Sequence, residues 1–224
     1  MTVCIVGNSH AGSLRLAYEA LPDKANLQWD FFVAPNGYAD AEGLRAIAYD
    51  AKRHAFLDFP YFSAAKGADL EIADYDCFVL VGAHHSAAHM VAMFPFDVSA
   101  GFRARAVQEI CQKSRLFDFA QKIRAVSAVR ILLVTKPAPT TIQRPGPQDI
   151  AAVQAVIETF WAKIRVEVLP QPAATMTAGG LTRADCFKSN ANQHFTPEAS
   201  AVAVDALRQV LALFGAWAGH AQVR

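Results

Sequence analysis

The sequence predicts a single α/β domain built around a parallel sheet. Short apolar runs rich in β-branched residues recur along the chain, a pattern typical of strands that are buried on both faces. Helical periodicity separates these runs, and parallel strands need such crossover connections. No repeat, low-complexity segment or linker divides the 224 residues. We therefore expect a three-layer α/β/α domain with a five-stranded parallel sheet of the flavodoxin-like type over residues 1–224.

Three strands are predicted in the first half of the chain. Residues 3–6 form a short apolar run that Gly7 ends, and a helical pattern follows almost at once. Residues 27–34 predict the second strand, which stops at the turn-forming Pro35-Asn36-Gly37. Residues 77–81 are the cleanest buried run in the chain and predict the third strand.

The connection over residues 38–73 has no clean period. A helix-compatible piece runs from about residue 42 to residue 54, and a cluster of aromatic residues follows it: Phe56, Phe59, Tyr61 and Phe62. A connection this long is unusual in a compact domain and often forms a lid or binding loop. The alternative is that the aromatic side chains pack over the sheet as part of the core. Both interpretations stay open at this point.

The second half of the chain predicts helices and strands in alternation: a helix over 99–126, a strand over 130–135, a helix over 148–164, a strand over 165–169 and a C-terminal helix from residue 196. Ser99 is the expected N-cap of the first of these helices. Thr196-Pro197-Glu198 combines a capping residue, a proline at the first helical position and an acid in the first turn.

Composition excludes several classes of function. The 21 basic and 20 acidic side chains give a net charge of +1, so no nucleic acid or anionic membrane surface is an expected partner. No apolar stretch is long enough to span a membrane, and polar residues interrupt the first apolar run too early for a signal peptide. None of the four cysteines has metal-site or redox spacing, which predicts buried free thiols and a cytoplasmic protein.

No cofactor is expected either. Ser9 stands where a dinucleotide fingerprint needs its second glycine, and no Gly-Lys-Ser/Thr phosphate loop occurs in the chain. His84, His85 and His89 suggest a metal site, but no Asp or Glu lies between Asp76 and Asp97 to complete one. Metal binding is therefore the weaker interpretation of these histidines, and lining of a site is the stronger one.

Four loops are expected to meet at the carboxyl edge of the sheet: residues 7–10, residues 36–37, residues 82–85 and the segment around His194. Acyl transfer needs a nucleophile, a base and donors aimed at the oxyanion. Ser9 can be the nucleophile and His194 the base, with the N–H groups of Ser9 and Gly37 as donors. The alternative is that Asn8 and Ser9 only cap the following helix.

The order and placement of these segments resemble the SGNH (GDSL-like) hydrolase superfamily. Its Gly-Asp-Ser, lone Gly, Gly-x-Asn-Asp and Asp-x-x-His motifs look like residues 7–9, Gly37, residues 82–85 and residues 191–194. The resemblance covers almost the whole chain and implies a serine esterase or acyltransferase that acts on a small ester such as an O-acylated carbohydrate. It implies Ser9 and His194 as catalytic residues and a set of oxyanion or substrate-binding residues: Asn8, Gly37, His84, His85 and Asn192.

Three positions depart from the family pattern. Asn8 replaces the acid before the serine, His84 replaces the oxyanion asparagine, and Ala191 replaces the acid that orients the catalytic histidine. Another group must then hold the His194 tautomer, and the sequence leaves several open: Asn190, Asn192, Asp185 or a backbone carbonyl. The second hypothesis is therefore a catalytically impaired protein of the same fold with a binding or accessory role in polysaccharide biosynthesis. The sequence gives no indication of an oligomeric state.

Overall fold

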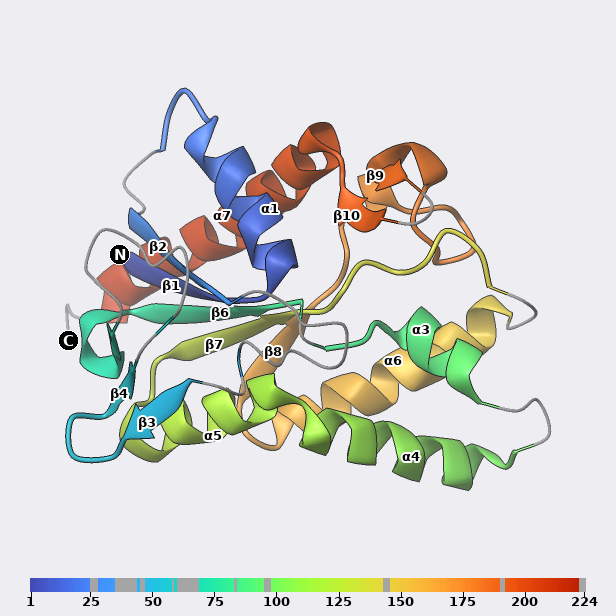
Figure 1. Cartoon of the computed structure of the whole chain (residues 1–224), viewed down its shortest axis with the longest axis horizontal. Helices are drawn as coiled ribbons and strands as arrows, with labels where there is room; N and C mark the ends of the chain where they lie inside the picture. Colours follow the sequence, from blue (N-terminus) through green and yellow to red (C-terminus); the bar gives the residue numbers. More distant parts are fainter. Residues whose placement is uncertain are drawn as a thin grey trace.

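A five-stranded parallel sheet forms the centre of the molecule (Figure 1). The computed structural model describes residues 1–24, 28–34, 44, 47–57, 59, 69–82, 84–94, 98–142, 146–189 and 192–221. The strands are β1 (Thr2–Gly7), β2 (Gln28–Val33), β6 (Cys77–Val81), β7 (Arg130–Val134) and β8 (Val166–Leu169). Their order is β2-β1-β6-β7-β8, and every pair is parallel. The predicted α/β architecture of flavodoxin-like type is confirmed.

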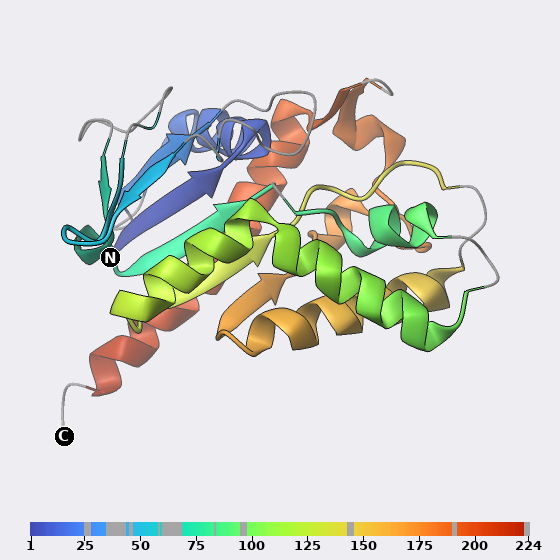
Figure 2. The same ribbon diagram turned by 60° about the horizontal axis from the view of Figure 1, so that its bottom comes forward.

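Helices cover both faces of this sheet (Figures 1 and 2). One face packs against α1 (Ser9–Glu19) and α7 (Pro197–Ala221). The other packs against α3 (Ala87–Met93), α4 (Ala100–Lys113), α5 (Arg115–Val126) and α6 (Pro147–Ala162). Successive strand residues point to opposite faces, so Val3 and Ile5 belong to the first layer of the core and Cys4 and Val6 to the second.

The predicted helix over residues 42–54 is wrong in its described part. Residues 48–57 instead form a hairpin of β3 (Ala48–Asp50) and β4 (Ala55–Leu57), to which β5 (Leu70–Glu71) adds a third antiparallel strand. The Asp50 carboxylate accepts hydrogen bonds from the N–H groups of Lys52 and Arg53, at 2.8 and 3.2 Å. These local bonds satisfy the turn backbone and favour a hairpin over a helix.

The described part of the long connection does not cover the carboxyl edge of the sheet. Both views place β3, β4 and β5 beside the N-terminus, at the opposite edge (Figures 1 and 2). Phe56 and Phe59 are buried there, and the Phe56 ring stacks on Phe119 with centroids 4.1 Å apart. For these two aromatic residues the core interpretation is the correct one. Tyr61 and Phe62 lie outside the described residues, and so does half of the predicted lid.

Three local features differ from the sequence prediction. The helix expected over 99–126 is two helices, because Ser114 adopts an extended conformation between α4 and α5. The short α3 was not predicted, and neither was the hairpin of β9 (Phe187–Ser189) and β10 (Asn192–Phe195). Short 3-10 turns complete the chain: Ile72–Asp74, Ala173–Thr175 and Ala184–Cys186.

The caps and thiols agree with the prediction. The Ser99 and Thr196 hydroxyls accept hydrogen bonds from the N–H groups of Phe102 and Ala199, so each caps its helix. All four cysteines are free and buried. In the part of the chain that is described, no helix has the length and apolar character needed to cross a membrane.

The turn after β6 requires glycine, and this requirement can be tested. Gly82 has a φ of +80°, and a Cβ there would fall 2.3 Å from Asn8 Oδ1. We expect Gly82→Ala to lower the free energy of unfolding by about 2 kcal/mol or more, as measured by chemical denaturation. Gly101→Ala is the matched control, because a Cβ at that helical position meets nothing within 4 Å. The control should leave stability unchanged or raise it by up to about 1 kcal/mol; equal losses in both variants would contradict the requirement.

Candidate active site

The Asn8 side chain ties the end of β1 to the turn after β6. Its Nδ2 donates to the Gly82 carbonyl at 2.7 Å, and its Oδ1 accepts from the His10 N–H at 3.0 Å. The side chain is fully buried, and both ends of the amide are engaged. The prediction that Asn8 binds substrate does not fit this placement, because the side chain is fully buried against Gly82 and the start of α1. Asn8 instead positions the start of α1.

Ser9 is the first residue of α1, at the carboxyl edge of the sheet. The first N–H groups of a helix have no acceptor within the helix. Asn8 accepts hydrogen bonds from the three N–H groups that follow Ser9. Its side chain accepts from the His10 N–H, and its carbonyl accepts from the N–H groups of Ala11 and Gly12. The Ser9 N–H is not among the groups that Asn8 satisfies. It therefore suits the donor role in an oxyanion hole, and the helix dipole adds to it.

Ser9 and His194 line the same cavity. This cavity has a volume of about 390 Å³ and lies between α1 and the β9–β10 hairpin. Its other lining residues are Gly12, Ser13, Arg15, Leu16, Val33 and Lys188. The structure thus brings together the two residues that the sequence predicted as nucleophile and base.

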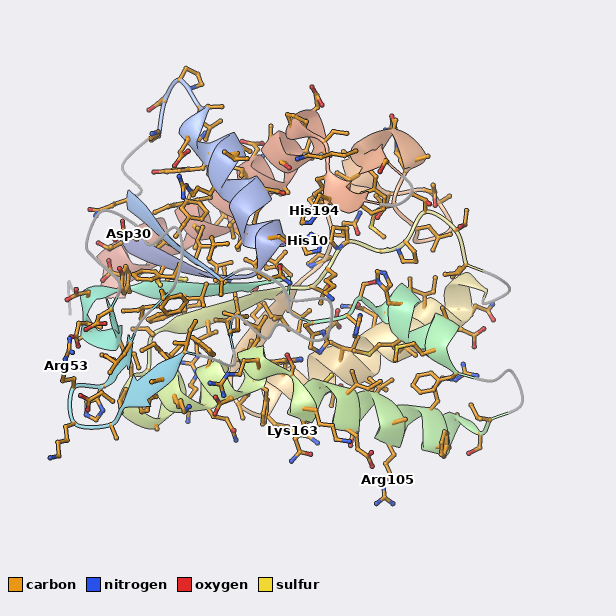
Figure 3. All side chains as sticks on the ribbon, viewed as in Figure 1. His10, Asp30, Arg53, Arg105, Lys163 and His194 are labelled. Atoms are coloured by element: carbon orange, nitrogen blue, oxygen red, sulfur yellow. The ribbon has the colours of Figure 1, made fainter. Side chains whose placement is uncertain are left out.

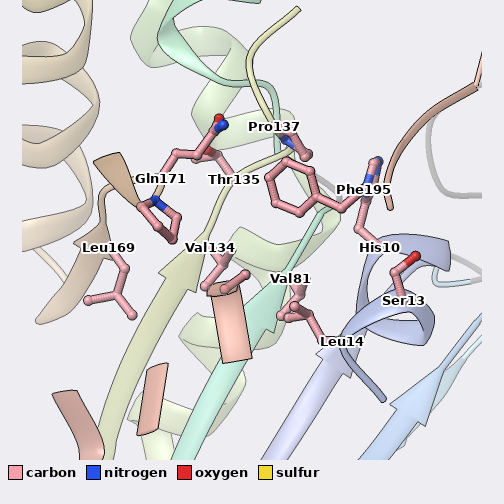
Figure 4. Close-up of a pocket in the computed structure, with 12 residues that line it drawn as sticks. His10, Ser13, Leu14, Val81, Val134, Thr135, Pro137, Leu169, Gln171 and Phe195 are labelled. Carbon is pink, nitrogen blue, oxygen red and sulfur yellow. The ribbon is translucent and has the colours of Figure 1, made fainter. Parts of the chain in front are cut away.

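Ser13 is within hydrogen-bond distance of the His194 ring. Its Oγ lies 3.4 Å from His194 Nδ1 and 3.4 Å from the Ser9 carbonyl oxygen. Ser13 also lines a smaller cavity of about 40 Å³ with His10, at the carboxyl ends of β6, β7 and β8 (Figure 4).

The His10 and His194 rings stack on each other, with centroids 4.5 Å apart and planes at 27° (Figure 3). Burial lowers the pKa of His10 to about 3, with repulsion from His194, Lys136 and His89 adding to the effect. Burial also lowers the pKa of His194, as does the nearby Lys188. Both imidazoles are therefore neutral at pH 7, which is the state that a general base needs.

His84 does not lie at the oxyanion site, so that expectation is corrected. It is buried in the core, where its Nδ1 donates to the His85 carbonyl at 2.8 Å. Its Nε2 accepts from Trp161 Nε1 at 3.3 Å and lies 3.1 Å from Cys111 Sγ. Burial lowers the pKa of His84 to about 4, so the ring is neutral at pH 7. Both ring nitrogens are engaged within the core, and none remains to donate to a substrate.

The other histidines of this loop pair with one another and with Ser86. The ring centroids of His85 and His89 are 5.8 Å apart, and Ser86 Oγ lies 2.8 Å from His89 Nδ1. Ser86 also caps α3 and is buried, which fits a structural role. No group of three or more potential metal ligands occurs among the described residues.

The structure does not describe the contacts of two predicted site residues, Gly37 and Asn192. Gly37 lies outside the described residues, so its predicted donor role stays a prediction. Asn192 is the first residue of β10 and pairs with Ser189, but its side chain is not among those described. Its predicted substrate-binding role also stays a prediction.

The sequence interpretation missed Ser13 and Lys188. Ser13 follows Ser9 by four residues, so the helical repeat places both on one face of α1. That spacing was available in the sequence. Lys188 reaches the cavity because β9 pairs with β10, and no sequence signal indicated this hairpin.

Comparisons with known proteins support the fold. No protein-family model matches the chain, and no curated protein matches it in sequence. Its fold is similar to that of a solved structure, the lipase Lip_vut3 from a goat rumen metagenome. The TM-score is 0.50 with 11% sequence identity, over 93% of this chain and 96% of the lipase. The two proteins share a single-domain α/β fold, and membership of the SGNH superfamily stays a hypothesis.

The lowered pKa values of His10 and His84 predict a loss of stability in mild acid. His10 and His84 stay neutral in the folded state until the pH approaches about 3 and 4, whereas in the unfolded state they protonate below about 6.5. The free energy of unfolding therefore begins to fall as the pH drops through about 6.5, and it continues to fall until the pH reaches the folded-state pKa values of about 4 and 3. We expect the free energy of unfolding to fall by about 3 kcal/mol between pH 6.5 and pH 5, in denaturation curves measured at each pH.

His84→Gln is the comparison variant, because its amide oxygen can still accept from Trp161. This variant should be less stable at pH 7 but should show roughly half the pH dependence. A stability that stays constant from pH 6.5 to pH 5 would contradict the lowered pKa values of these two rings.

Proposed function

We propose that the protein is a serine esterase or acyltransferase in which Ser9 forms an acyl-enzyme and His194 is the general base. The observation that carries this proposal is that both residues line one cavity at the carboxyl edge of the sheet. The neutral state of His194 supports the role of base. The similar fold of a lipase is consistent with an esterase-type hydrolase.

The reaction proceeds in two steps. His194 accepts the Ser9 hydroxyl proton as Ser9 Oγ attacks the ester carbonyl, and the Ser9 N–H donates to the oxyanion. The tetrahedral intermediate expels the alkoxide, which takes the proton from His194 and leaves as an alcohol. Water or a sugar hydroxyl then attacks the acyl-enzyme with His194 again as base, and Ser9 recovers its proton. Water gives hydrolysis and a sugar hydroxyl gives transfer.

The substrate class that we propose is a small ester, in particular an O-acylated carbohydrate. The cavity of about 390 Å³ falls within the size range of pockets for small molecules. Its lining combines hydroxyl groups and cations with the apolar Leu16 and Val33, which suits a polar acceptor with a short acyl group. Four free, buried thiols support a cytoplasmic location for this activity.

A fluorophosphonate probe tests the nucleophile directly. We expect the wild-type protein to be labelled on Ser9 and to hydrolyse p-nitrophenyl acetate. An activated serine displaces fluoride from the probe and is phosphonylated, and it displaces p-nitrophenolate from the ester and is acetylated. Ser9→Ala should abolish the labelling and reduce turnover by at least about 1000-fold.

The position of the label must be assigned by fragment ions, because trypsin leaves Ser9 and Ser13 together in the peptide of residues 1–15. Ser127→Ala is the control for serine removal away from the cavity, and it should label like the wild type. Absence of labelling together with absence of ester turnover would favour the binding or accessory role. A label on Ser13 would replace Ser9 as the nucleophile.

The charge of Lys188 should set part of the pH dependence. Burial, and in addition the charge of Lys188, lowers the pKa of His194 below its ordinary value of 6.5, so ester turnover should rise with pH through an apparent pKa below 6.5. Lys188→Met removes this positive charge and should move the acid limb of kcat/KM upward by roughly a few tenths of a pH unit. Lys163→Met, at the end of α6, is the matched control and should leave the profile in place. If the acid limb of the kcat/KM profile does not move in Lys188→Met, Lys188 does not contribute to the lowered pKa of His194.

A further inference from the structure

The Ser13 hydroxyl lies between two groups of the proposed site. It is 3.4 Å from the Ser9 carbonyl oxygen, one helical turn earlier, and 3.4 Å from His194 Nδ1. A serine hydroxyl has one proton to donate and two lone pairs that accept. A serine inside a helix commonly donates this proton to the carbonyl four residues before it. With its proton directed to Ser9, Ser13 Oγ presents its lone pairs to His194 Nδ1.

This arrangement selects one tautomer of His194. A lone pair at Ser13 Oγ favours the imidazole with its proton on Nδ1, because that N–H can then donate to the oxygen. The unprotonated nitrogen is then Nε2, the atom that serves as base in sites where the other nitrogen is held by an acid. The family pattern that the chain resembles has an acid three residues before the histidine, and this chain has Ala191 there.

We propose that Ser13 is a positioning residue that holds His194 in the Nδ1–H tautomer, so that Nε2 is the base toward Ser9. The proposal rests on the proposed function for the base role, while the tautomer itself does not depend on activity. Because the hydroxyl is neutral, Ser13 orients the ring without stabilising the imidazolium as a carboxylate does. This agrees with the lowered pKa of His194, to which burial and Lys188 both contribute.

The tautomer can be read directly by NMR. The ¹⁵N shifts of the His194 ring, measured in full-length protein above its pKa, distinguish the Nδ1–H from the Nε2–H form. We expect Nδ1–H in the wild type, a shift toward Nε2–H in Ser13→Ala, and recovery in Ser13→Thr, whose hydroxyl can make the same backbone bond. An Nε2–H ring in the wild type, or no change in Ser13→Ala, would overturn the proposal. The His194 tautomer can be read by NMR even in a protein without esterase activity. The failure of the Ser13 proposal can therefore be distinguished from the failure of the proposed function.

Kinetics supply the second readout. Ser13→Ala should lower kcat for p-nitrophenyl acetate by roughly five- to tenfold with little change in KM, and Ser13→Thr should restore it. Ser13→Asp places a carboxylate beside Nδ1, so kcat should recover and the acid limb should move upward by about one pH unit. A merely structural role predicts a lower melting temperature in Ser13→Ala without a tautomer change, without rescue by threonine and without the pH shift in Ser13→Asp. That combination would overturn the proposal.

Discussion

The buried amide of Asn8 is the interaction on which the candidate site depends. One end of the amide holds the turn after β6 through the Gly82 carbonyl, and the other end holds the start of α1 through the His10 N–H. A buried side chain of this kind must satisfy both its donor and its acceptor, and here it does so with two different loops. The positive φ of Gly82 and the missing Cβ leave room for the amide. As a result, β1, β6 and α1 share one fixed junction, and Ser9 stands at its outer edge.

Electrostatics at this edge keep the histidines neutral. His10 and His194 stack, so protonation of one ring disfavours protonation of the other, and Lys136 and Lys188 add positive charge nearby. Burial is the larger cause of the lowered pKa of both rings. In a site of this kind the histidine rings are unprotonated at neutral pH without a change in conformation. The neutral state makes proton acceptance available, but it also gives a weaker base than a ring paired with a carboxylate.

The sequence predicted the main sheet well because the fold rests on local signals. Buried β-branched runs, glycine and proline stops and the caps at Ser99 and Thr196 each indicate structure within a few residues. The predicted helix before residue 54 was wrong for two reasons: the Asp50 carboxylate caps a local turn that the helical interpretation overlooked, and Phe56 packs on Phe119, a contact far away in the sequence. Ser114 divides a helix whose periodicity runs through it, since that serine adopts an extended conformation.

The candidate site was predicted in part for the same physical reason. Ser9 and His194 follow from loop order, because the carboxyl ends of parallel strands share one edge. His84 could not be placed, since its direction into the core is set by Trp161 and Cys111 from two distant helices. Lys188 entered the cavity through a hairpin that left no clear pattern in the chain.

The contact between Ser13 and His194 separates two tasks that one carboxylate performs in a catalytic triad. An acid beside the histidine fixes its tautomer and also stabilises the imidazolium that forms in the transition state. A hydroxyl that donates its proton to the Ser9 carbonyl can perform only the first task, because it carries no charge. The stabilisation of the positive ring must then come from elsewhere, and Lys188 opposes it. Within the proposed mechanism, an oriented but weak base favours an ester over an amide as substrate, because the alkoxide of an ester leaves more readily than an amine.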